Sequence, residues 1–279
     1  MNCIFCKEIS DSSKSVEHII PESLGNKTHI LNAGIVCDQC NQYFALKIEK
    51  KLLEKKYFTE VRHRNLIESK KRKIPKSKGI MGGEVDILKK RDGKTEIVIE
   101  DSKIFEGVQN GRIKHMIIQI IEEPEKNDKT MSRFLAKIAI ETLAQRFYPH
   151  TGWNELINEK RELDPIRNYA RYGNEIEFWE YHQRRIYDET DRFYNPKISD
   201  VPYEVLHEQN LIYLKEGELF LVLVLFGIEY AINLSNPKIG GYIEWLKNND
   251  NQCPIIEKNE RQIIKGSTTH NNSNRCTSH

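Results

Sequence analysis

The chain has 279 residues, of which 38% are hydrophobic and 30% are charged, and its formal net charge is +2. At ~150 residues per domain, this length allows about two domains and a sizeable core. No run of ~18 apolar residues occurs, which excludes a transmembrane helix, and no basic segment followed by an apolar one opens the chain. We therefore expect a cytoplasmic protein without membrane contacts.

Charge is divided unevenly along the chain. Residues 1–80 hold 16 Lys and Arg against nine Asp and Glu, a net charge of +7, whereas the remainder holds 27 against 32. A basic N-terminal third suits a polyanionic partner such as a nucleic acid. A solvated, lysine-rich surface has the same composition, so charge alone does not identify the partner.

Four of the six cysteines form two Cys-x-x-Cys pairs near the N-terminus. Two such pairs can close a tetrahedral zinc site, because each tight turn presents two sulfurs. A segment of ~50 residues buries little apolar surface, so metal binding would supply part of its folding free energy. The sequence predicts one structural Zn²⁺ per chain, held by Cys3, Cys6, Cys37 and Cys40; reduced thiols without metal are the alternative.

The segment between the cysteine pairs reads as two short strands followed by a helix. Residues 16–20 form the first strand, which carries Glu17 and His18 and is closed by Pro21. Residues 24–27 are a turn, and residues 30–36 return as a second strand. A helix is expected from Asp38 onward, because apolar residues recur at helical spacing after it: Phe44, Ile48, Leu52 and Leu53.

These residues resemble the zinc-stapled branch of the HNH endonuclease family. The resemblance rests on Glu17-His18-Ile19-Ile20-Pro21, on Leu31-Asn32 and on Cys37-Asp38-Gln39-Cys40-Asn41. It covers about residues 1–55 and implies a ββα-metal finger that cleaves phosphodiester bonds with a divalent metal. We therefore expect an α+β fold, in which an N-terminal ββα-metal zinc finger precedes a mixed α+β domain with antiparallel strands.

The resemblance implies a role for four residues of the finger. His18 corresponds to the general base and Asn32 to the asparagine that helps to orient it. Glu17 and Asn41 correspond to the ligands of the catalytic metal. Glu17 stands where aspartate is common, and Asn41 stands where many members have histidine. Carboxylate and amide oxygens suit Mg²⁺ or Mn²⁺ better than Zn²⁺.

The chemistry of these residue types is consistent with phosphodiester hydrolysis. A neutral imidazole can take a proton from water near pH 7, and a divalent cation stabilises the anionic phosphate and the leaving oxygen. Neighbouring residues on a strand point to opposite faces, so His18 and Glu17 would not crowd one another. We expect an endonuclease that acts on DNA, preferably double-stranded, and RNA is the alternative substrate. A non-catalytic zinc-stapled nucleic-acid-binding or adaptor module is the alternative.

Basic residues of the finger helix and of the segment after it are candidates for contacts with backbone phosphates. They are Lys47, Lys51, Lys55, Lys70, Lys71, Arg72 and Lys73. For each of them, a solvated surface is the alternative interpretation.

The predicted domain limits are residues 1–56 for the finger, 57–79 for a basic helix end and linker, and 80–264 for the α+β domain. Residues 265–279 read as a disordered polar tail. The α+β domain carries no chemical motif, so we expect it to target, sense or oligomerise through a second copy or a partner protein. Analogy alone suggests a bacterial anti-phage defence or mobile-element role.

Within residues 80–264, a hairpin is expected around Asp92-Gly93 and a strand over residues 113–121. A long helix is expected over residues 131–147, with one apolar face. The remaining expectations are helix over 152–159, over parts of 163–185 and near 242–245, and strands over 204–207, 211–215, 219–225 and 229–234.

Overall fold

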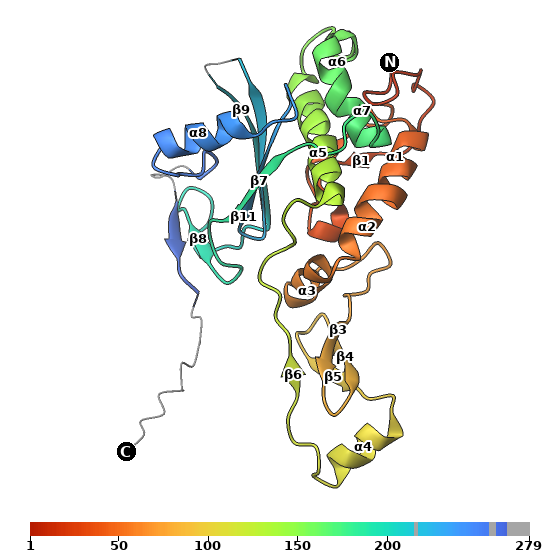
Figure 1. Ribbon diagram of the computed structural model, residues 1–279, viewed down its shortest axis with the longest axis vertical. Helices are drawn as coiled ribbons and strands as arrows, with labels where there is room; N and C mark the ends of the chain where they lie inside the picture. The colour runs from red at the N-terminus through yellow and green to blue at the C-terminus, as the bar shows by residue number, and fades with distance from the viewer. Residues whose placement is uncertain (215–216, 257–260, 267–279) are drawn as a thin grey trace.

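The computed structural model describes residues 1–214, 217–256 and 261–266. Two bodies of structure flank one long helix, α5 (Lys129–Phe147), and a third extends away from it (Figure 1). The N-terminal finger, residues 1–64, lies on one side of α5, and a four-stranded sheet lies on the other. A small arm, residues 77–118, extends away from the end of the finger. The molecule has the mixed α+β architecture with antiparallel sheets that the sequence predicts.

The finger follows the predicted order of strand, strand and helix. Its two strands pair antiparallel, with Glu17 opposite Leu31 and His18 opposite Ile30. They are shorter than predicted, with two residues each, because the chain turns at Pro21 into a helical turn. Its elements are β1 (Glu17–His18), η1 (Glu22–Leu24), β2 (Ile30–Leu31), α1 (Asp38–Phe44), η2 (Ala45–Glu49), α2 (Lys50–Leu53) and α3 (Lys56–Arg64).

The arm is a second antiparallel sheet, with the strand order β5-β4-β3-β6. The predicted hairpin is confirmed, and Gly93 makes its turn with a φ of 81°. The prediction of a strand over residues 113–121 is wrong in length. The observed strand has only two residues, which pair with Gly79 and Ile80. The elements of the arm are β3 (Ser77–Ile80), β4 (Glu84–Lys89), β5 (Thr95–Val98), α4 (Ser102–Gln109) and β6 (Ile117–Ile118).

The predicted long helix is confirmed as α5, and it is buried on every side rather than on one face. Asp128 caps its first turn by accepting a hydrogen bond from the Thr130 N–H at 2.9 Å. Its burial extends to the charged residues Lys137 and Glu141. The helices that follow are α6 (Trp153–Glu159), η3 (Arg161–Leu163) and α7 (Asp164–Tyr172).

The C-terminal sheet has the antiparallel order β7-β11-β10-β9. One face packs against α5 and the other against α8 (Gly240–Asn248), where a helix was predicted. The strands predicted over 204–207 and 211–215 form one strand, and β7 lies where helix was expected. The strands are β7 (Tyr181–Arg185), β9 (His207–Tyr213), β10 (Leu219–Leu225) and β11 (Ile228–Asn233), with a separate ribbon of β8 (Arg192–Tyr194) and β12 (Gln262–Ile264).

The finger and the rest of the molecule share their largest hydrophobic core. This core contains residues of the finger, such as Ile19 and Phe44, together with Phe134 of α5 and Tyr230 of the sheet. The predicted domain limits stay predictions, but the finger does not bury its apolar surface alone. Most of the predicted disordered tail, residues 267–279, lies outside the described residues. Among the described helices, none has the length and apolarity needed to cross a membrane.

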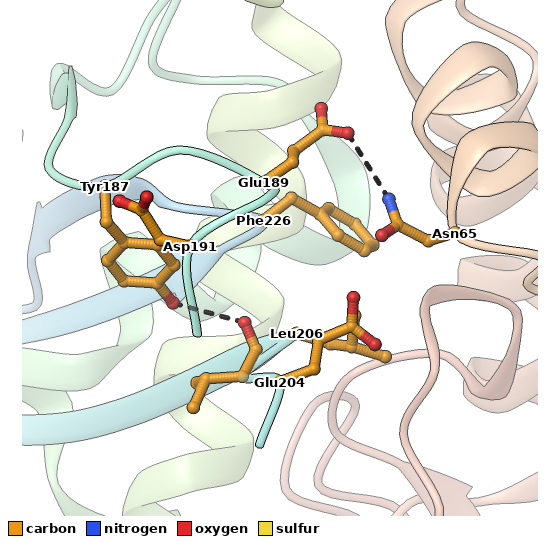
Figure 2. A pocket seen from close by; sticks show the side chains of 8 residues that line it. Asn65, Tyr187, Glu189, Asp191, Glu204, Leu206 and Phe226 are labelled. Atoms are coloured by element: carbon orange, nitrogen blue, oxygen red, sulfur yellow. Dashed lines mark hydrogen bonds between the residues drawn. The ribbon is translucent and has the colours of Figure 1, made fainter. Parts of the chain in front are cut away.

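Polar contacts also connect both ends of the finger to the rest of the molecule. At the far end, Glu189 accepts a hydrogen bond from Arg64 Nη2 at 2.6 Å. It also accepts one from Asn65 Nδ2 at 3.4 Å (Figure 2). The cavity beside this contact has a volume of about 10 Å³, enough for one water molecule and too small for a ligand. At the near end, the fully buried Arg167 of α7 donates to the Ile4 carbonyl at 2.7 Å and to the Ile157 carbonyl at 2.8 Å.

We expect Arg167→Ala to lower the free energy of unfolding by about 2–4 kcal/mol, because it leaves two buried carbonyls without a charged donor. Urea denaturation with zinc present measures this change. The matched control is Arg161→Ala, since Arg161 is exposed in the same region. A value for Arg167→Ala within 0.5 kcal/mol of the control, on the scale of ordinary surface substitutions, would show that this contact does not hold the finger.

Candidate functional site

The structure brings the four predicted zinc ligands together. The sulfur atoms of Cys3, Cys6, Cys37 and Cys40 all lie within 4.8 Å of one another. The Sγ atoms of Cys6 and Cys37 are 3.7 Å apart. A tetrahedron with Zn–S bonds of about 2.3 Å has edges of about 3.8 Å, so this spacing fits zinc. All four cysteines are free thiols and not disulfides.

Backbone N–H groups and one arginine support negative charge on these sulfurs. Cys37 caps α1, and its Sγ accepts from the Cys40 N–H at 3.4 Å. The Sγ of Cys3 accepts from the Cys37 N–H at 3.3 Å, and the Sγ of Cys40 accepts from Arg171 Nε at 3.3 Å. Arg171 belongs to α7, so a helix distant in sequence also supports the cluster.

The thiols do not ionise equally when they are so close together. The Cys40 thiol and the Cys37 N–H lower the pKa of Cys3 to about 5, whereas burial raises the pKa of Cys6 to about 11. Four thiolates at this spacing repel one another unless a cation lies between them. The donor set and its geometry therefore fit a structural metal ion of +2 charge.

His18 lies on the open face of β1. It pairs with Ile30, which is exposed, and residues directly opposite in an antiparallel pair share a face. Its Nδ1 atom is buried and has no hydrogen-bond partner among the residues that the structure describes. The main chain beside it is held firmly, since the Ile19 N–H donates to the His29 carbonyl at 3.1 Å. The main chain at His18 is thus fixed, and the ring carries one buried nitrogen whose hydrogen-bonding capacity is unused among the described residues.

Two of the predicted asparagines lie near this strand. Asn41 Nδ2, on α1, donates to the Val16 carbonyl at 3.2 Å and so ties the helix to the start of β1. Asn32 is exposed, and its Nδ2 donates to the Tyr148 hydroxyl at 2.8 Å. Tyr148 follows α5, so helix α5 contributes to the surroundings of the finger here as well.

A third asparagine, which the sequence placed in an ordinary turn, organises the loop after β1. Asn26 is fully buried. Its Nδ2 donates to the carbonyls of Ile20 at 2.6 Å and His29 at 2.9 Å, and its Oδ1 accepts from the N–H groups of Thr28 and His29. These four hydrogen bonds fix the loop that connects β1 to β2.

Glu17 points away from His18, as the alternation of a strand predicts. Its side chain faces the core and is 6% exposed, and its Oε1 lies 2.6 Å from the Nζ of Lys137 in α5. Burial raises the pKa of Glu17, and Lys137 opposes that shift. Glu17 and Asn41 offer the oxygen donors that Mg²⁺ or Mn²⁺ prefers. In this structure, however, the Lys137 ammonium holds the position at Glu17 that such an ion would need.

Lys137 is the centre of a buried group of charges, which we call the Lys137 cluster. Its Nζ lies 2.6 Å from Glu17, 2.9 Å from Glu49 and 3.0 Å from Glu141. Burial alone would lower the pKa of Lys137, but Glu141, Glu17 and Glu49 together hold it well above its usual range. Sequence analysis missed this cluster, although a Lys–Glu pair four residues apart in a helix of otherwise buried apolar residues is a signal for it.

The predicted phosphate-binding residues fall into two groups. Lys47 and Lys51 are exposed on the finger helix and form no ion pair within the described part of the chain. Lys55 forms ion pairs, because its Nζ lies 2.9 Å from Asp128 and 3.5 Å from Glu125. The basic turn, Lys70-Lys71-Arg72-Lys73, is fully exposed and is closed by a hydrogen bond from the Arg72 N–H to the Ser69 carbonyl at 2.7 Å.

A cleft of about 1010 Å³ opens between the basic turn, the loop after β1 and the start of β9. Three basic residues, Lys27, Lys70 and Arg72, and two acidic ones, Glu22 and Glu68, line it, and we call it the basic cleft. A second hollow of about 240 Å³ shares Ser69 and Lys70 with it and reaches Glu49. The basic turn therefore stands between two hollows, one of which borders the Lys137 cluster.

Comparison with known proteins identifies the finger. Residues 3–57 match the family model of the HNH endonucleases. No curated protein and no solved structure matches the chain. The matched segment contains both cysteine pairs, Glu17, His18, Asn32 and Asn41. The resemblance to this family is confirmed for about a fifth of the chain.

We expect the purified protein to contain one Zn²⁺ per chain and Cys37→Ser to lose it, because three thiolates bind the ion far more weakly than four. Metal analysis by mass spectrometry measures both. Cys253→Ser is the control, since Cys253 is buried near the C-terminal sheet and outside the cluster. Protein that lacks zinc when freshly purified, or Cys37→Ser protein that keeps it, would contradict the assignment.

Proposed function

We propose that this protein is a metal-dependent endonuclease that hydrolyses phosphodiester bonds of DNA, with His18 as the general base. The observation that carries the proposal is the match of residues 3–57 to the HNH endonuclease family, since the matched segment indicates a nuclease. Residues 80–264 would target, sense or oligomerise. The activity would belong to the cytoplasm, as an effector of bacterial defence or of a mobile element.

The surroundings of His18 support a role in proton transfer. A general base needs a ring nitrogen that is free to accept a proton and a main chain that holds the ring in place. The Nδ1 of His18 is buried and has no partner among the described residues, so the half-buried ring would have to turn to present it to water. The main chain of β1 is fixed by hydrogen bonds on both sides. In the proposed reaction, His18 takes a proton from the attacking water, and Asn32 helps to orient His18.

Glu17 and Asn41 are the residues that would hold Mg²⁺ or Mn²⁺. When bound, such an ion neutralises the phosphate and stabilises the leaving oxygen. Asn41 contributes from the helix that begins at the second cysteine pair, so the structural zinc would set its distance from β1. Glu17 contributes from the buried face of β1 and would have to leave the Lys137 ammonium to reach the ion.

The basic cleft and the exposed lysines of the finger helix support a polyanionic substrate. Lys27, Lys70 and Arg72 outnumber the two acidic residues, Glu22 and Glu68, at a hollow beside the finger, and this excess of positive charge would attract a phosphate backbone. Lys47 and Lys51 are free to add contacts, while Lys55 is already neutralised by Asp128. We assign double-stranded DNA as the preferred substrate.

One observation favours the alternative, a zinc-stapled nucleic-acid-binding or adaptor module without catalysis. The carboxylate proposed to bind the metal is bonded to a buried lysine, as a purely structural residue would be. This alternative retains the zinc and the basic cleft but gives His18 no role. Activity measurements on a His18 variant therefore separate the two functions.

We expect the wild-type protein to nick or cut plasmid DNA in Mg²⁺ or Mn²⁺, and His18→Ala to reduce the rate by about 100-fold or more, because the water loses its general base. Zinc content should stay unchanged. His115→Ala, a variant of an exposed histidine in the arm, serves as control. Equal rates for wild type and His18→Ala across several metals would support the binding module instead.

We expect the triple variant Lys70→Glu, Lys71→Glu, Arg72→Glu to bind DNA more weakly, with a salt dependence whose slope is smaller by about 2–3, because up to three phosphate contacts are lost. Fluorescence anisotropy over a range of salt concentrations measures this. A triple Lys→Glu variant at the exposed Lys114, Lys197 and Lys247 is the control for net charge. If both triple variants lose affinity equally, the basic turn has no special role.

A further inference from the structure

The buried lysine next to the proposed centre has more acidic partners than it needs. The ammonium of Lys137 lies within 3.0 Å of three carboxylates, and the one from Glu141 accepts no hydrogen bond among the described residues. Two main-chain carbonyls lie slightly farther away, that of His18 at 3.4 Å and that of Ile19 at 3.5 Å. If the Glu17 carboxylate moved away, the Lys137 ammonium would still lie beside the carboxylates of Glu49 and Glu141 and the two main-chain carbonyls.

Glu17, in contrast, has a single charged partner, because Lys137 is the one cation that contacts it among the described residues. Its side chain is 6% exposed, so water cannot replace that partner. A buried carboxylate without a partner is strongly unfavourable. Glu17 can therefore leave Lys137 only by taking up a proton, which burial favours, or by binding another cation, and the proposed metal is such a cation.

We propose that Lys137 is a positioning residue that competes with the divalent metal for Glu17 and so sets the metal affinity of the nuclease centre. This inference rests on the proposed function. In the metal-free chain, Lys137 holds Glu17 on the core side of β1. When the metal binds, Glu17 transfers to it, and Lys137 stays with Glu49 and Glu141.

The competition links the metal site to helix α5. Lys137 and Glu141 belong to α5, whereas Glu17 and Glu49 belong to the finger, at β1 and at the end of η2. A ligand or partner that moves α5 relative to the finger would change the hold of Lys137 on Glu17. By linkage, metal binding would favour the same movement.

The test is Mn²⁺ binding by calorimetry, with the zinc left in place. Lys137→Met removes the competing ammonium, so we expect Mn²⁺ to bind at least ten-fold more tightly than to wild type. Lys137→Arg keeps the charge and should stay within about three-fold of wild type. In a Glu17→Gln background, Lys137→Met should have no effect, because the shared carboxylate is absent. Wild-type affinity in folded Lys137→Met, or the same gain in the Glu17→Gln background, overturns the proposal.

A matched control separates this effect from lost stability. Arg184 of β7 forms a partly buried ion pair with the fully buried Glu229, at 2.9 Å, in the C-terminal sheet. Arg184→Met should lower the thermal midpoint of unfolding and leave Mn²⁺ affinity unchanged. If Arg184→Met tightens Mn²⁺ binding as much as Lys137→Met does, general loosening explains the gain and the proposal fails.

A second measurement uses a chain whose core is intact, in case Lys137→Met does not fold. Lysine residues are labelled with ¹³C at Cε, and the Lys137 signal is assigned by its absence from Lys137→Arg. Mg²⁺ should shift this signal in wild type and leave it in place in Glu17→Gln. A Lys137 signal that Mg²⁺ does not move overturns the inference, even where the nuclease assay succeeds. If Mg²⁺ shifts the Lys137 signal but the wild type does not cleave DNA, the proposed nuclease function fails and the competition for Glu17 stands.

Discussion

The buried ammonium of Lys137 is the contact on which the arrangement of the site depends. It joins three pieces of chain: β1 through Glu17, the end of η2 through Glu49, and α5 through Glu141. Removing one partner of a buried ion pair typically costs about 3–5 kcal/mol, because the remaining charge has no water around it. The strand that carries His18 is thus attached directly to a helix more than a hundred residues away in sequence.

The zinc cluster and the Lys137 cluster hold the finger in different ways. The four cysteines join the first turn of the chain to the start of α1, and Arg171 and Arg167 of α7 support them from outside. Sulfur ligands of this kind make a closed structural site. The proposed catalytic ion would instead bind oxygen atoms of Glu17 and Asn41. The finger would therefore use two metals, one to fix its shape and one to act on phosphate.

Local patterns predicted the finger well and its surroundings poorly. The Cys-x-x-Cys spacing, the apolar period after Asp38 and the alternation of Glu17 and His18 all depend on residues close in sequence. The Glu17–Lys137 pair joins residues 120 positions apart, and Glu49 is turned toward it by a π-helical turn, where the Lys50 N–H bonds to the Ala45 carbonyl. Similarly, β7 pairs with β11 and not with its neighbours in sequence, so its short polar stretch gave no strand pattern. Long-range partners of this kind leave no periodic signal in one sequence.

In the proposed arrangement, Glu17 is shared between Lys137 and a divalent metal. Crystals of the zinc-loaded protein soaked in Mn²⁺, with diffraction recorded at the zinc and manganese absorption edges, test it most directly. We expect a zinc peak among the four cysteines and a separate manganese peak bound by Glu17 and Asn41, with Lys137 turned toward Glu49 and Glu141. A manganese peak elsewhere, with the Glu17–Lys137 pair intact, would contradict it.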